Sequence, residues 1–324
     1  MTVHGISADG AKLIGWATLP VPFATLAVIL RFVSRKSAKK VGSDDWCMLF
    51  ALILYFGLYI SLVTWAPIGK VGFPQKDLNS EQVEEFLKLF FCVQIFYGWV
   101  GPAIKMSFLL LYRRVFVVKW FLRITLLVAT LVMIWCISVT LTVIFECQPV
   151  GSYWQPLLQQ HCIDSQKFYW ANGISNLLLD VIILCLPIPM IWRLQMSMRS
   201  KISLTGVFTL GGFICAASIL RITYLWFIVF DNVSGTIAIP SIWTSLEPGL
   251  GIVCGCLPTF PSLFRRWSEI YSSKRGRSGS KLFSLTNDRF LRIRRTNKDS
   301  QQTDFPPQDS TSNLRSDRDI EMVS

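Results

Sequence analysis

The chain has 324 residues, of which 52% are hydrophobic and 16% charged, and its formal net charge is +12. A soluble protein of this length would carry far more charge, so this composition and a mean hydropathy of +0.45 indicate a membrane protein. No zinc-finger or basic-zipper spacing accompanies the positive charge. We therefore expect anionic inner-leaflet lipid, and no nucleic acid, as the partner of the basic residues.

Seven long apolar segments follow one another, each close to the roughly 20 residues that cross a hydrocarbon core about 30 Å thick. Because backbone polar groups in lipid must be satisfied within the protein, each segment is expected to be a helix. The sequence therefore predicts an all-α membrane protein, a bundle of seven transmembrane helices at residues 12–31, 46–66, 87–112, 122–145, 169–192, 203–229 and 240–263.

Basic residues fall almost entirely into every second gap between these segments, in clusters that begin at Arg31, Arg113 and Arg193. Cytoplasmic loops carry the excess of Lys and Arg. We thus expect residues 1–11 to be a short extracellular N-terminus and residues 12–264 the membrane domain. Residues 265–324 should form a mostly disordered cytoplasmic tail, first basic and then acidic. The first segment is expected to remain uncleaved, and the plasma membrane is the expected location.

Polar motifs mark the inner ends of two predicted helices. Asp44 and Asp45 stand just before the second helix, where a carboxylate can cap the helix and oppose its dipole. Tyr112, Arg113 and Arg114 close the third helix at the inner interface, where aromatic rings and snorkelling cations belong.

Two of the nine cysteines lie in an outer loop, between the fourth and fifth helices. Cys147 and Cys162 would meet an oxidising compartment there, and a disulfide between them is predicted. Cys92, near the outer end of the third helix, is the rival partner for either. Both histidines lie outside the spans, so no metal site is expected in the membrane.

Four ionisable residues lie well inside the predicted spans, and their cost in hydrocarbon makes them the leading candidates for a site. Arg221 and Glu247 lie at similar depth in the outer half and can pair across the sixth and seventh helices. Asp180 lies nearer the midplane and can form an ion pair with either Arg221 or Lys105. Two interpretations stay open: a buried ionic network that orders the bundle, and a ligand pocket or proton path.

Several motifs occur together in chain order. They are Arg31-Phe32-x-x-Arg35, Gly42-x-Asp44-Asp45-Trp46, the run from Lys105 to Phe116, Cys147-x-Pro149 with Trp154 and Cys162, Asn176-x-x-x-Asp180, Leu186-Pro187-x-Pro189, Arg221, and Glu247 followed by Pro258 and Pro261. Over roughly residues 12 to 265, this pattern resembles the fungal rhodopsin-like integral membrane proteins. That family includes membrane proteins of satratoxin-type gene clusters and the transmembrane part of Pth-type receptors.

The resemblance implies a seven-helix membrane protein of a filamentous fungus, often encoded beside secondary-metabolite genes or thought to sense surface cues. It also adds Asn176 to the four intramembrane candidates. It implies no established chemistry, so no catalytic residue and no cofactor is assigned. Retinal is not expected, because residues 240–263 contain no lysine that could form a Schiff base.

A receptor-like function is favoured, in which the bundle binds a small lipophilic molecule and the basic inner surface contacts a cytoplasmic signalling protein. One alternative is a membrane-embedded tailoring enzyme with Asp180 or Glu247 as general acid in an apolar pocket. The other is a transporter of a secondary-metabolite pathway, although the hydropathy pattern shows no inverted repeat.

Overall fold

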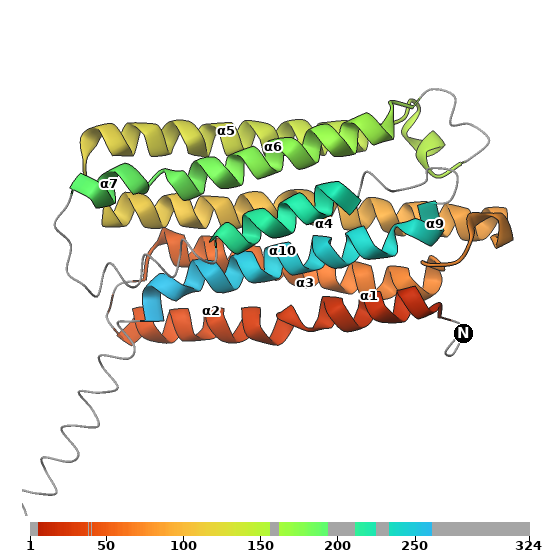
Figure 1. The fold of residues 1–324 in the computed structure, drawn as a ribbon, viewed down its shortest axis with the longest axis horizontal. Coiled ribbons are helices and arrows are strands. Elements are labelled where there is room, and N and C mark those ends of the chain that lie inside the picture. Colours follow the sequence, from red (N-terminus) through yellow and green to blue (C-terminus); the bar gives the residue numbers. More distant parts are fainter. Residues whose placement is uncertain are drawn as a thin grey trace, which may run out of the picture. The chain divides into compact units, whose positions relative to one another are not determined.

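The computed structural model of the protein describes residues 6–155, 162–193, 211–224 and 233–260, apart from residues 38 and 40. Within these ranges the chain is helical and forms no β-strand, so the expected all-α class is confirmed. Its helices run side by side (Figure 1). The expected tail, residues 265–324, lies outside the described residues, as do most of the fifth gap and both ends of the sixth predicted segment.

Among the described residues, five helical stretches are long and apolar enough to cross a membrane: Ala8–Ser37, Ser43–Ile68, Ser80–Val115, Lys119–Ile144 and Ser165–Met190. The first is interrupted. It consists of α1 (Ala8–Thr18) and α2 (Pro20–Ser37), with Leu19 between them. Proline lacks a backbone N–H and clashes with the carbonyl four residues earlier, so Pro20 begins a new helix. The predicted span at 12–31 lies within this stretch, and the break before Pro20 was not predicted.

Three long helices follow: α3 (Ser43–Ile68), α4 (Ser80–Val115) and α5 (Lys119–Ile144), with the 3₁₀ helix η1 (Gln75–Asp77) before α4. After η2 (Val150–Tyr153), α6 (Ser165–Cys185) ends before Pro187 and α7 (Ile188–Arg193) begins. The remaining described elements are the apolar helix Gly211–Tyr224, α9 (Val233–Thr236), α10 (Ala238–Cys256) and η5 (Leu257–Thr259).

Buried apolar side chains form two clusters that share α4. The first cluster joins α1, α2, α3, α4 and α10 and includes Leu58 and Ile104. The second joins α4, α5, α6 and α7 and includes Leu109 and Val132. In Figure 1, α4 runs between these two groups of helices. Side chains of α4 that face the boundary between the clusters therefore meet helices from both.

The contact of α10 with α2 and α3 depends on a glycine. A Cβ atom at Gly249 would lie 2.7 Å from the Cβ of Pro20 and 2.8 Å from the hydroxyl of Tyr55. Tyr55 is fully buried, so its ring has little room to move. Helices in lipid gain no hydrophobic free energy from touching each other, and small residues that allow close packing are therefore decisive.

We expect Gly249→Ala to lower the melting temperature of the detergent-purified protein, because overpacking of a tight contact costs roughly 1–3 kcal/mol. Gly15→Ala in α1 is the matched control, since a Cβ there meets nothing within 4 Å and alanine favours helix. Thermal unfolding followed by fluorescence-detected size exclusion measures both. Equal melting temperatures for the two variants would contradict this account of the α10 contact.

Candidate functional site

The five intramembrane candidates form one connected polar network at the boundary between the two apolar clusters. The Lys105 Nζ on α4 lies 2.8 Å from Oδ1 of Asp180 on α6 and donates to Oδ1 of Asn176, also at 2.8 Å. The Nδ2 of Asn176 in turn donates to Oε1 of Glu247 on α10 at 2.9 Å. The Nε of Arg221 lies 3.1 Å from Oε2 of Glu247. We call these five residues the seam network.

An aromatic ring lies against each cation of the seam network. The guanidinium of Arg221 lies over the ring of Tyr97, 4.9 Å from its centroid, and the ammonium of Lys105 lies 6.0 Å from the ring of Trp135. The Tyr97 hydroxyl donates to Glu247 at 3.3 Å. Such cation–π contacts replace part of the lost hydration of a buried cation.

The charges of the seam network balance, with two cations and two carboxylates. Lys105, Arg221 and Glu247 are 5%, 5% and 7% exposed, so they are almost entirely withdrawn from the surface. Isolated charges at this depth would be very costly, and pairing within the protein lowers that cost. The sequence left the partner of Asp180 open between Lys105 and Arg221, and the structure pairs it with Lys105.

A disulfide closes one end of the bundle. Cys147 and Cys162 are bonded, with their Cα atoms 4.1 Å apart, while Cys92 is a free and exposed cysteine. The disulfide links the chain after α5 to the chain before α6, and we call this end the disulfide end. Beside it, Glu146 is 2% exposed and accepts a hydrogen bond from the Ser165 hydroxyl at 2.6 Å. Burial raises the pKa of Glu146, while the Ser165 hydrogen bond lowers it by a smaller amount.

Two cavities border the seam network. A small cavity of about 70 Å³ is lined by Lys105, Asp180 and other residues of α4, α6 and α10. A cavity of about 450 Å³, here called the large cavity, lies toward the disulfide end and is lined by Arg221 and Glu146, among others. Tyr97 lines both cavities. The seam network therefore borders both cavities, with Arg221 on the large one and its other four members on the small one.

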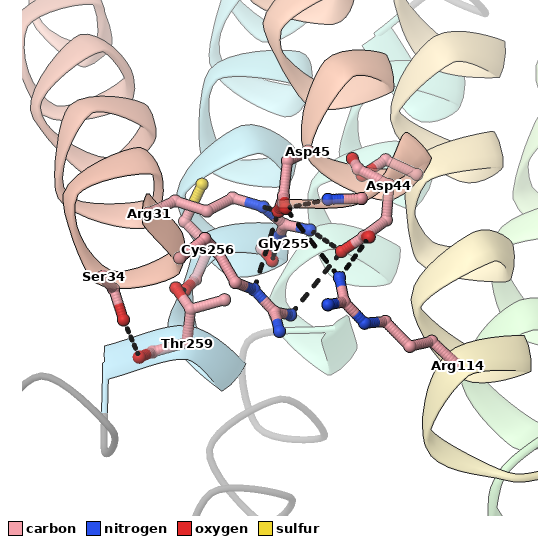
Figure 2. A network of polar contacts seen from close by, with 11 residues as sticks. Arg31, Ser34, Asp44, Asp45, Arg114, Gly255, Cys256 and Thr259 are labelled. Atoms are coloured by element: carbon pink, nitrogen blue, oxygen red, sulfur yellow. Dashed lines mark hydrogen bonds and ion pairs between the residues drawn. The ribbon is translucent and has the colours of Figure 1, made fainter. Parts of the chain in front are cut away.

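A second charged network lies at the other end of the helices, which we call the Arg31 end (Figure 2). Arg31 on α2 is fully buried. Its guanidinium donates to Asp45 at 2.7 Å, to Asp44 at 2.6 Å and to the carbonyl of Gly255 on α10 at 2.6 Å. Arg114 on α4 donates to Asp44 at 2.9 Å. One guanidinium thus joins three helices, and Arg114 adds a fourth.

The structure extends the roles expected for the acidic pair Asp44 and Asp45 and for the motif that ends α4. Asp45 accepts a hydrogen bond from the N–H of Gly42 at 2.9 Å, which is a cap of α3. Asp44 instead pairs with arginines, so capping describes only part of what the two carboxylates do. At the end of α4, Tyr112 is buried and Arg113 is exposed.

The central position of Arg31 was missed from the sequence. A signal for it was present: Arg31 and Arg35 lie one turn apart at the end of the first predicted span, and the acidic pair begins the next. Consecutive antiparallel helices bring these segments to the same end of a bundle, and Arg35 indeed lies 3.5 Å from Asp44. The arginines had been assigned to the inner-leaflet surface on charge alone.

We expect Arg31→Met to cost about 3–5 kcal/mol, because it leaves buried carboxylates without their main partner. Arg31→Lys should restore little of the lost stability, since one ammonium cannot donate to all three acceptors with the geometry of a guanidinium. The yield of monodisperse protein and its melting temperature measure both effects. Arg113→Met removes an exposed arginine and should have the melting temperature of the wild type. An Arg31→Met protein with the same melting temperature as Arg113→Met would refute a stabilising role for this network.

Comparison with known proteins gives a consistent picture. The profile of the fungal rhodopsin domain matches residues 30–266, well over half of the chain. The chain is 28% identical to the polyenoic acids biosynthesis gene cluster protein Ba17b of Metarhizium anisopliae, over 79% of this chain and 74% of that protein. It is 32% identical to a SAT4 family membrane protein of Emericella nidulans, over 60% of this chain and 50% of that protein.

Another relative, the receptor GIN3 of Arthrobotrys oligospora, is 29% identical over 79% of this chain and 65% of its own length. No solved structure matches the chain.

Proposed function

The chain belongs to the fungal rhodopsin domain family, and from that premise we propose that it is a receptor-like membrane protein whose helix bundle binds a small lipophilic molecule. The observation that carries this proposal is the connection between the large cavity and the seam network. Arg221 lines the large cavity and also pairs with Glu247 at 3.1 Å. A molecule that occupies the cavity can therefore act directly on a buried ion pair.

The seam network offers a route by which such binding can change the bundle. Glu247 forms an ion pair with Arg221 and accepts hydrogen bonds from Asn176 and Tyr97, and these three partners lie on three different helices. An acceptor group that competes with Glu247 for Arg221 would loosen the contact between α10 and its neighbours. A ligand shifts a conformational equilibrium only through such a difference in contacts between two states.

The relatives support this proposal and suggest a source for the molecule. One is named a receptor, and another is named for a polyenoic acid biosynthesis gene cluster. For this chain we propose association with a secondary-metabolite gene cluster and a product of such a pathway as the ligand. A cytoplasmic signalling protein would bind at the Arg31 end and detect the change in the bundle there.

The proposal includes a topology of seven spans. Gly211–Tyr224 and α10 would be the described parts of the sixth and seventh, with residues 1–11 outside and residues 265–324 in the cytoplasm. The disulfide end would face the oxidising outside. The Arg31 end, with Arg31, Arg35 and Arg114, would face the cytoplasm and its anionic lipids. The plasma membrane is the proposed location.

A tailoring enzyme, the second candidate, receives less support from the geometry. Asp180 and Glu247 each lie within about 3 Å of a cation, at 2.8 Å from Lys105 and 3.1 Å from Arg221. Both carboxyl groups are thus held by partners inside the protein, whereas a general acid must be free to transfer a proton to its substrate.

Epitope tags at the two ends of the chain test the topology. We expect antibody to stain an N-terminal tag on intact protoplasts and a C-terminal tag only after permeabilisation, because seven spans place the ends on opposite sides. Equal staining of both tags on permeabilised cells is the control. Accessibility of both tags on intact cells, or of neither, would show an even number of spans.

Replacing Arg221 by Met and Glu247 by Gln, singly and together, tests the function. The double variant removes both charges, so it should regain membrane abundance that the singles lose. In a strain that lacks the native gene, we expect the double variant to be abundant yet fail to restore the transcriptional response to the organism's own culture extract.

Full restoration of that response by the double variant would show that the Arg221–Glu247 pair has only a structural role. Accumulation of an unmodified precursor in the deletion strain would favour an enzyme instead. Retention of an unchanged product inside the cells would favour a transporter.

A further inference from the structure

We propose that the large cavity at the disulfide end is a binding site for a small uncharged molecule with several hydroxyl groups on a flat apolar body. The inference deepens the proposed function, on which it rests in taking the bundle to bind a ligand, by naming the place and the chemistry. At about 450 Å³ the cavity has the size of a small-molecule site.

The walls of the large cavity are rich in aromatic rings, contributed by Phe86, Phe90, Tyr97, Tyr153 and Tyr169. These rings also contact one another, with the centroids of Phe86 and Phe90 6.2 Å apart and those of Phe90 and Tyr169 also 6.2 Å apart. Flat faces of this kind favour stacking or edge contacts with a planar ligand. The body of the ligand is therefore expected to be aromatic or otherwise conjugated.

Leaving aside Nε of Arg221, which faces Glu247 at 3.1 Å, four buried polar atoms around this cavity have no hydrogen-bond partner among the described residues. They are Oε1 of Gln94, Oε2 of Glu146, Oδ1 of Asn172 and Nη2 of Arg221. All four residues line the large cavity, and Glu146 and Arg221 are only 2% and 5% exposed. Buried polar atoms in native proteins are nearly always paired, so their concentration around one cavity points to a ligand that pairs them.

The kinds of these atoms define the ligand further. Three are oxygen acceptors and one is a donor, so the complementary molecule offers more donors than acceptors, as a polyhydroxylated compound does. Arg221 is already neutralised by Glu247. A ligand carboxylate would add a charge near Glu146 and Glu247, whereas a ligand ammonium would add one near Arg221. An uncharged ligand avoids both penalties.

The test uses the purified full chain and matched stilbenes as probes: trihydroxystilbene, its trimethyl ether and stilbene-4-carboxylic acid, with tyramine as a cationic phenol. We expect trihydroxystilbene to raise the melting temperature in a saturable way and the trimethyl ether to bind roughly tenfold more weakly per lost hydrogen bond, or not at all. Absence of stabilisation by trihydroxystilbene, or equal stabilisation by its ether, would overturn the inference, since water alone could then pair these atoms. Tighter binding of the acid or of tyramine would overturn its uncharged character.

Two variants place the site. Oδ1 of Asn172 has no hydrogen-bond partner to lose among the described residues, so Asn172→Leu should fold normally and weaken the binding of trihydroxystilbene roughly tenfold. Gly98 lines the cavity, and a Cβ there meets nothing within 4 Å, so Gly98→Leu should fill the space and abolish binding. Gln166→Leu changes an exposed residue of α6 and serves as control. Binding unchanged in both cavity variants would place the ligand elsewhere.

The binding assay is separable from the proposed function. Specific binding by purified protein, together with a normal transcriptional response in a deletion strain, would leave the site standing and remove the receptor role. A lost response without binding of any hydroxylated probe would leave the receptor role standing and remove the proposed site.

Discussion

The arrangement of this bundle depends on one constraint: a charge among apolar helices must be neutralised inside the protein. Each of the buried pairs described above joins different helices, so each pair sets the relative depth of two helices as well as their contact. Lys105 and Asp180 do this for α4 and α6, and Arg31 does it for α2, α3 and α10. Because apolar contact alone drives little association in lipid, these pairs and the close approach at Gly249 decide how the helices pack.

The helix α10 takes part in the polar contacts at both levels of the bundle. Glu247 belongs to the seam network, and the carbonyl of Gly255 accepts from Arg31. The two residues are eight positions apart, which is about 12 Å along a helix. Pro248 lies between them, but the helix continues to Cys256, so a displacement at Glu247 can also move the acceptor of Arg31. The helix α10 therefore provides a physical connection between the seam network and the Arg31 end.

Much of this fold could be predicted from hydropathy, because the requirement for long apolar helices acts on composition. The positions of the five described spans follow from the length of the apolar segments, and the Arg221–Glu247 pair follows from depth counting. The break at Leu19 was missed because hydropathy does not register a proline that starts a new helix. The partner of Asp180 stayed open because depth does not reveal which helices are neighbours. Asp44 and Asp45 were interpreted as caps because a local rule explained them, and this drew attention away from Arg31, whose contact with Gly255 involves a helix more than 200 residues further along the chain. The large cavity left no sequence signal, since its polar lining residues are scattered over α4, α6, the helix Gly211–Tyr224, α9, α10 and the segment that follows α5.

The charge balance of the seam network has an electrical consequence. A single charge that crosses the membrane potential gains or loses about 2.3 kcal/mol per 100 mV. The seam network holds two cations and two carboxylates, and in each pair they lie within about 3 Å of each other. The two members of each pair lie on different helices, so a movement that keeps a pair intact must carry both helices together, and it then transfers no net charge through the field. The membrane potential does almost no work on such a joint movement, whereas a movement that separates a cation from its carboxylate would be sensitive to voltage.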